Sequence, residues 1–216
     1  QNLIDGIRET HGKSNTWLTI ATSCAMSRGD YDVALLIFKD LVLMHPGDKH
    51  YLVNLDCLNL MSANESTREE ARRRLEAFRL EPGLSKNVLR NLSRYYRHFN
   101  QPGEALLTME ELKDKHGLTW PERVVFADLK RSFSESIAKE QIKGWEEEAV
   151  DDASGIYFLA NWYLQGGDPA SALVLLNRGG KYLPIPSLYF LKAEALVQLQ
   201  ECRVIERSFP RHDCCI

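Results

Sequence analysis

The 216-residue sequence has no long apolar run, whereas a membrane-spanning helix needs about 18 or more consecutive apolar residues. Its first residues, QNLIDGIRETHGK, lack the basic stretch and apolar run of a secretory signal peptide. The formal net charge of −3 is too small to favour a nucleic acid or a membrane surface as the partner. We therefore expect a cytoplasmic location, and the start at Gln1 instead of Met favours a segment excised from a longer chain.

The sequence also lacks the short motifs that commonly carry catalysis. It has no glycine-rich phosphate loop, no Gly-x-Ser-x-Gly elbow and no His-Glu-x-x-His helix. Its six histidines are scattered without the spacing of metal ligands. Its five cysteines form no disulfide framework, and their odd number favours a reducing compartment. We expect no intrinsic enzymatic activity, no cofactor and no metal.

What the sequence does contain is an internal repeat. A small residue inside a predicted helix returns roughly every 34 residues, at Ala34, Ala71, Ala105, Ala138 and Ala172. The residues thirteen positions before and four positions after each of these alanines are all apolar. A period in this range is typical of stacked helical hairpins, because one hairpin cannot bury its apolar face without neighbours.

Turn residues separate the two helices of several repeats. Gly29-Asp30, Asn100–Gly103 and Gly166–Pro169 fall between paired helices, while Pro46 and Pro82 close the second helix of two units. These turns and the small–apolar pattern resemble the tetratricopeptide (TPR) family, most clearly in the first, third and fifth units. In the second unit the repeat runs a few residues long, and in the fourth Glu122 stands where the others are apolar.

The resemblance implies an all-α fold, a right-handed α-solenoid of TPR-like helical hairpins. We expect one elongated domain over residues 15–200, with about five hairpins and a terminal helix. Residues 1–14 are expected to form an N-terminal extension, and residues 201–216 an irregular or truncated C-terminal tail. A generic α-solenoid of similar hairpins is the alternative.

In TPR-like stacks the first helix of each hairpin lines a concave face, so groove positions can be counted back from the repeat alanine. The third unit is basic at fifteen, eleven and eight residues before it, and the fourth unit is basic at fifteen and eight. These positions hold Arg90, Arg94, Arg97, Arg123 and Lys130. Arg90, Arg94 and Arg97 share one helix face by their spacing. The same positions hold Thr19 and Asp56 in the first two units and Tyr157 and Asn161 in the fifth.

This pattern predicts a protein-interaction scaffold or adaptor that binds a protein or peptide segment in the groove. Arginine favours carboxylates, so the partner that fits best is an extended peptide with acidic residues and an apolar anchor. The alternative is that the arginines form a solvated helix face. The carboxylate clamp of chaperone-binding TPR proteins is not met, because Thr19 and Ser23 stand in place of its Lys and Asn.

Two other functions remain open at this point. The chain could be the recruitment segment of a larger catalytic or transport protein. Helical repeats can also read RNA, but only two units are basic at the groove positions, which does not favour a nucleic acid. The sequence does not determine the oligomeric state.

Overall fold

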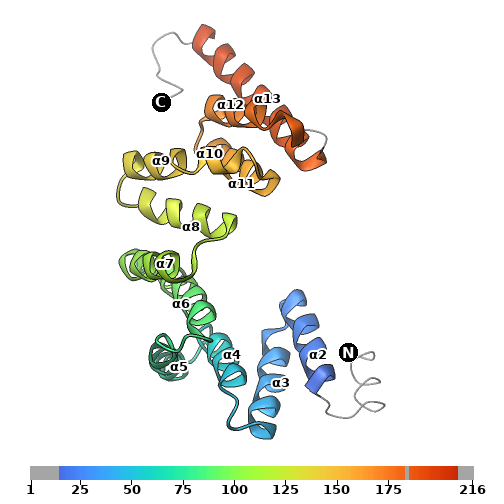
Figure 1. Ribbon diagram of the computed structural model, residues 1–216, viewed down its shortest axis with the longest axis vertical. Coiled ribbons are helices and arrows are strands. Elements are labelled where there is room, and N and C mark those ends of the chain that lie inside the picture. Colours follow the sequence, from blue (N-terminus) through green and yellow to red (C-terminus); the bar gives the residue numbers. More distant parts are fainter. Residues whose placement is uncertain (1–14, 183–184, 209–216) are drawn as a thin grey trace. The chain divides into compact units, whose positions relative to one another are not determined.

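The computed structural model describes residues 15–182 and 185–208, and these residues form helices joined by short turns (Figure 1). In chain order the elements are α2 (Asn15–Arg28), α3 (Tyr31–Met44), α4 (Lys49–Asn59), α5 (Glu65–Phe78), α6 (Ser85–His98), α7 (Pro102–His116), α8 (Trp120–Arg131), α9 (Glu135–Lys143), α10 (Glu146–Ala149), α11 (Ala153–Gln165), α12 (Pro169–Arg178), the 3-10 turn η1 (Gly180–Tyr182) and α13 (Pro186–Ser208). No strand occurs in the described residues. The expected all-α class is confirmed.

The helices pair as hairpins, namely α2–α3, α4–α5, α6–α7, α8–α9 and α11–α12. Short polar residues at the turns begin the second helices. The Asn64 side chain accepts the backbone N–H of Thr67 at 3.1 Å, and Asp168 accepts that of Ser171 at 3.0 Å. Gly29 has a positive φ of 77°, which suits glycine in the turn between α2 and α3.

The repeat alanines occupy equivalent positions near the start of the second helices. All five are fully buried, at 0% exposure; they are Ala34, Ala71, Ala105, Ala138 and Ala172. A small side chain at such a position lets two paired helices approach closely. The expected burial of the repeat alanines is therefore confirmed.

The single domain expected over residues 15–200 is divided in the structure into two compact units, residues 1–116 and 117–216. Gly117, with a positive φ of 69°, opens the loop between them. Unit 2 has its own continuous core, which includes Ile142, Ile156 and Leu159. In unit 1, Leu75, Leu89, Leu92 and Leu112 are among the fully buried side chains.

The second hairpin differs from the expected register. Its first helix, α4, buries Val53, Asp56 and Leu60, two positions earlier than the count from Ala71 predicts. The turn between α4 and α5 extends from Leu60 to Asn64, and this longer connection shifts the whole helix face. Asp56 is therefore a buried residue and not the groove residue that we expected.

The C-terminal boundary also differs from the expectation. Helix α13 continues to Ser208, beyond the expected end of helical structure at Gln200. Residues 201–208 contain no proline or glycine that would stop a helix. The expected extension at residues 1–14 and the rest of the tail, residues 209–216, lie outside the described residues. Among the described helices, none has the length and apolar character required to cross a membrane.

Candidate functional site

One cavity of the described chain lies in unit 1. Its volume is about 560 Å³, and residues of α2, α3, α4 and α6 line it. Three of these helices, α2, α4 and α6, are the first helices of successive hairpins. Ser23, Leu60 and Arg94, which stand eleven residues before the repeat alanines, are among the residues that line it.

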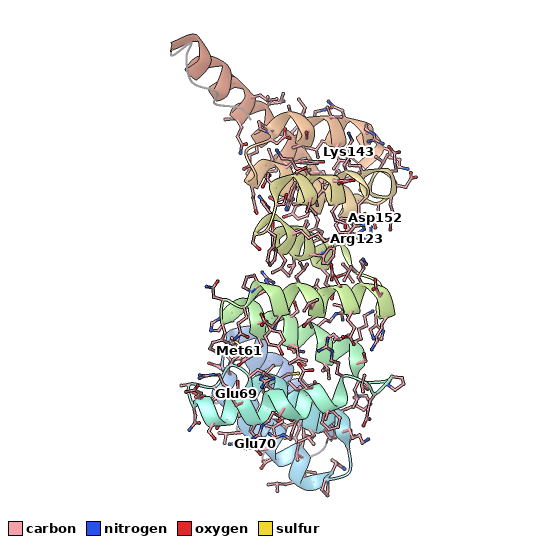
Figure 2. The ribbon with its side chains drawn as sticks, turned by 90° about the vertical axis from the view of Figure 1, so that its left-hand side faces the viewer. Met61, Glu69, Glu70, Arg123, Lys143 and Asp152 are labelled. Carbon is pink, nitrogen blue, oxygen red and sulfur yellow. The ribbon has the colours of Figure 1, made fainter. Side chains whose placement is uncertain are left out.

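Aromatic and aliphatic side chains form one part of the cavity wall. Phe38 and Leu41 come from α3, and Tyr51 and Met61 come from α4 and the turn after it. Met61 is 43% exposed and is labelled in Figure 2. Tyr31, at the start of α3, is 57% exposed on the same cavity. These side chains offer a partly open apolar contact surface.

A chain of amide side chains crosses the cavity from α4 to α6. The Nδ2 of Asn87 donates to the Oδ1 of Asn54 at 3.1 Å. The Nδ2 of Asn91 donates to the Oδ1 of Asn87 at 2.9 Å and to its backbone oxygen at 2.9 Å. At the two ends of this series, the Nδ2 of Asn54 and the Oδ1 of Asn91 take no part in these hydrogen bonds. A primary amide can bind both the N–H and the C=O of an extended backbone.

Arg94 brings a positive charge to this cavity. Its side chain is exposed, and Arg90 and Arg97 are exposed on the same helix. Cys57 lines the cavity from α4, and burial raises the pKa of its thiol to about 12, with the nearby Asp56 adding to the shift. The thiol is therefore protonated at neutral pH and is a poor nucleophile.

The two other predicted cations belong to unit 2, on α8. Arg123 donates two hydrogen bonds to the carboxylate of Glu148, at 2.7 and 2.8 Å. Its guanidinium also stacks over the ring of Trp120, 4.2 Å from the centroid, and only 17% of its side chain is exposed. The expectation that Arg123 is largely exposed is wrong, because its own unit supplies both a counter-ion and an aromatic surface.

A hydrogen bond from the indole of Trp120 to Asp152, at 2.6 Å, extends this cluster. Arg123 and Asp152 lie close together in Figure 2. Hydrogen bonds from Arg123 hold the pKa of Glu148 below its ordinary value, and the Trp120 hydrogen bond does the same for Asp152. Charged and aromatic groups thus fix the beginning of α8 against the turn before α11.

Lys130 is half-buried, with its Nζ 4.7 Å from the ring centroid of Phe126 and 3.4 Å from the Oε1 of Gln141. Tyr157 and Asn161, both on α11, are also half-buried. Tyr157 packs against the apolar core of unit 2. These three predicted residues are therefore less accessible than the arginines of α6.

The sequence reasoning missed the asparagines of the cavity. Counting from Ala71 placed Asp56 on the groove face of the second unit, whereas the two-residue shift places Asn54 there. The separation of Asn54 and Asn87, which is close to one repeat period, was the available signal. In the described residues no cluster of histidine, cysteine or carboxylate side chains could hold a metal ion.

No family model matches the sequence, and no curated protein matches it. Several solved structures are similar to it, and three of them are described here. A tetratricopeptide repeat protein from Parabacteroides merdae has a TM-score of 0.54 and 15% identity, covering 91% of this chain and 79% of that one. MamA protein has a TM-score of 0.44 and 13% identity over 92% and 94% of the two chains. The structure of Naa15/Naa10 bound to HypK-THB has a TM-score of 0.45 and 11% identity over 99% and 34%.

Identities this low can show only that two proteins share a fold. Of these three structures, the protein from Parabacteroides merdae is similar enough, with its TM-score of 0.54, to support that comparison. The repeated hairpins and the five buried alanines of this chain agree with such a fold. The fold of this chain is an α-solenoid of helical hairpins, similar to the fold of that tetratricopeptide repeat protein.

Proposed function

We propose that the protein is an interaction scaffold that binds an extended segment of a partner protein in the unit 1 cavity. The observation that carries the proposal is the cavity itself, about 560 Å³ in volume and lined by the first helices of three successive hairpins. Repeat folds commonly use such a surface, built by equivalent positions of neighbouring units, to bind other proteins. The proposed role is binding and not catalysis.

The chemistry of the cavity indicates what kind of segment fits. The amide chain of Asn54, Asn87 and Asn91 offers hydrogen bonds to an extended backbone. Phe38 and Met61 supply a surface for an apolar side chain, and Arg94 supplies a cation for a carboxylate. The segment that we propose therefore carries an acidic residue close to an apolar one.

Within this proposal Arg90 and Arg97 strengthen the positive potential along α6, while Arg123 and Lys130 have secondary roles. Arg123 already pairs with Glu148, so a partner carboxylate would have to replace an existing ion pair. Arg94 is thus the residue whose charge is tested first.

The test is a selection from a displayed library of random peptides, using the whole chain as bait. We expect native protein to enrich peptides that combine acidic and apolar residues, and Arg94→Glu to lose this enrichment by at least about tenfold, the effect of a like-charge contact. Lys86→Glu is the matched control, because Lys86 is exposed on the same helix but does not line the cavity. Circular dichroism confirms that each variant folds.

A titration of the enriched peptide at increasing salt completes the test. Binding through Arg94 should weaken as salt rises, because exposed charges are screened over about 10 Å at 0.1 M. The proposal is wrong if no peptide is enriched, or if Arg94→Glu enriches the same peptides as the native chain. Binding that does not depend on salt would remove the acidic residue from the proposal and leave the apolar anchor.

A further inference from the structure

Two side chains that line the unit 1 cavity leave apolar surface in contact with solvent. Tyr31 is 57% exposed, and Met61, labelled in Figure 2, is 43% exposed. Removing apolar surface from water is favourable, so a segment that covers these side chains is stabilised by the contact. A part of the same chain that reaches the cavity can provide this cover when no partner is bound.

The chain enters the described structure on a helix that forms part of this cavity. Helix α2 begins at Asn15, and Thr22 and Ser23 of this helix line the cavity. Ser23 lies eight residues after Asn15, which corresponds to about 12 Å along a helix. A nine-residue segment such as residues 6–14 spans up to about 30 Å when it is extended. The residues before α2 are therefore long enough to turn back along this helix and reach the cavity.

The sequence before α2 contains a stretch of the kind that the cavity favours. Residues 3–7 read LIDGI, and Asp5 is the one charged residue among them. Ile4 precedes it directly, and Ile7 follows two positions later. The partner segment proposed for the cavity likewise has an acidic residue close to an apolar one. The chain thus carries a segment of this composition within reach of its own cavity.

Each feature of this stretch has a counterpart among the side chains of the cavity. Arg94 provides a cation for the carboxylate of Asp5. Phe38 and Met61 provide an apolar surface for one of the isoleucines. The Nδ2 of Asn54 can donate a hydrogen bond to a backbone carbonyl. Charge, apolar surface and backbone hydrogen bonds therefore all fit one short segment.

We propose that residues 3–7 occupy the unit 1 cavity when no partner is bound, with Asp5 against Arg94. The inference rests on the proposed function, because it names an internal occupant of the same cavity. The short tether keeps this segment at an effective concentration on the order of millimolar, so a weak contact is enough. A partner then binds by displacing it. Residues 209–216 follow α13 of unit 2 and continue no wall of the cavity.

The first experiment needs no partner. The photo-crosslinking residue p-benzoylphenylalanine replaces Ile7 in the full chain, and mass spectrometry maps the crosslinks that form on irradiation in dilute solution. We expect crosslinks to Met61 or Phe38 of the same chain. Arg94→Glu should lower their yield by about half or more, because a like-charge contact weakens the closed state about tenfold. Lys86→Glu, an exposed reversal outside the cavity, is the control.

An exchange of the two charges tests their pairing directly. Asp5→Lys alone should lower the crosslink yield in the same way as Arg94→Glu alone. The double variant with both substitutions restores opposite charges, so its yield should return toward that of the native pair. Circular dichroism checks that each variant folds.

The second experiment measures how the peptide selected from the displayed library binds to variants of the segment. Asp5→Lys should strengthen this binding by about threefold to tenfold, because the apparent affinity is proportional to the fraction of open cavities. Glu9→Lys is the matched control, since it reverses a charge in the same segment but outside residues 3–7. It should bind the peptide like the native chain.

The proposal is overturned if the probe at position 7 forms no crosslink within the cavity, or if its crosslinks join two chains, which would mean an exchange between copies. It is also overturned if Asp5→Lys leaves the affinity for the selected peptide unchanged. In these cases the proposed function still stands when the peptide binds and Arg94→Glu weakens it. Cavity crosslinks in a chain that selects no peptide would instead support the internal contact and remove the external partner.

Discussion

At the residue scale the most informative side chain is Asp56, a fully buried carboxylate in a column that is apolar in other hairpins. Its exposure is 0%, and Arg74 of α5 donates to both of its oxygens, at 2.9 and 2.6 Å. The arginine side chain remains 36% exposed. The pair therefore joins a charge inside unit 1 to one that still reaches solvent.

Removing one member of this pair should cost more than removing both. We expect Arg74→Met to lower the free energy of unfolding by about 3 kcal/mol, because it leaves the buried carboxylate of Asp56 without its counter-ion. Adding Asp56→Leu should recover most of that loss, since leucine suits an apolar column. Urea unfolding measures both variants, and Arg73→Met is the control, because Arg73 is exposed on the same helix.

If the double variant is no more stable than Arg74→Met, Asp56 does not occupy a position that accepts an apolar side chain. If Arg74→Met itself changes stability by less than about 0.5 kcal/mol, the range of ordinary surface substitutions, the ion pair contributes little to folding.

The ion pair of Arg123 and Glu148 predicts a pH dependence. Its hydrogen bonds lower the pKa of Glu148 from the ordinary value of 4.5, so the folded state favours the carboxylate more than the unfolded state does. The resulting stabilisation is complete above pH 4.5 and is lost as the pH falls through the lowered pKa. Because Glu148 is 61% exposed, the effect should be small.

The measurement compares the native chain with Glu148→Gln in urea at about pH 6 and about pH 3. The native chain should be the more stable at the higher pH, and its advantage should shrink at the lower pH. An advantage of equal size at both pH values would show that the charge of Glu148 does not stabilise unit 2.

At the element scale each hairpin depends on a small residue where its two helices meet. Ala105 on α7 is 0% exposed, and α7 packs extensively against α6. We expect Ala105→Leu to lower stability by about 1–3 kcal/mol, because the larger side chain has no space in a close-packed contact. The control is Leu107→Ala, since Leu107 is 65% exposed on the same helix. Thermal unfolding followed by circular dichroism measures both.

An unchanged midpoint for Ala105→Leu would mean that α6 and α7 can separate at low cost.

The second hairpin shows that the register of a first helix can shift while the small residue on the second helix stays buried. Ala71 of α5 remains fully buried although the face of α4 moves by two positions. In this hairpin the contact at the repeat alanine of the second helix is therefore kept, although a longer turn shifts the buried face of the first helix.

At the scale of the whole molecule the chain divides into two units, and its tryptophans allow the units to be followed separately. Trp120, Trp145 and Trp162 belong to unit 2, whereas Trp17 belongs to unit 1. Circular dichroism reports helix in both units. We expect Arg74→Met to shift the circular dichroism midpoint in urea while the tryptophan fluorescence midpoint stays near its native value, because Arg74 lies in unit 1.

Coincident shifts of both signals would show instead that the two units unfold as one cooperative structure, as neighbouring repeats do when their interfaces are strong. The native chain and Arg73→Met provide the reference curves for both probes.

The sequence by itself determined the fold class and the hairpin contacts. A period of about 34 residues and its apolar columns depend on local helix geometry, which repeats along the chain and can be counted. The same count gave Arg94 a groove position, and its role as a binding residue stays a prediction. The sequence can predict the place of a residue where that place depends only on the geometry of one helix and on the repeat period.

Only the tertiary structure decided which polar groups face one another. Arg123 looked like a groove cation, but Glu148, 25 residues away, neutralises it. Asp56 looked like a groove residue, but the longer turn after α4 rotates it into the core, where Arg74 binds it. A shift of two residues turns a helix by more than half a revolution, and a counter-ion from another helix has no signature in the repeat. The energies of these contacts depend on distance and burial, which the order of residues alone does not contain.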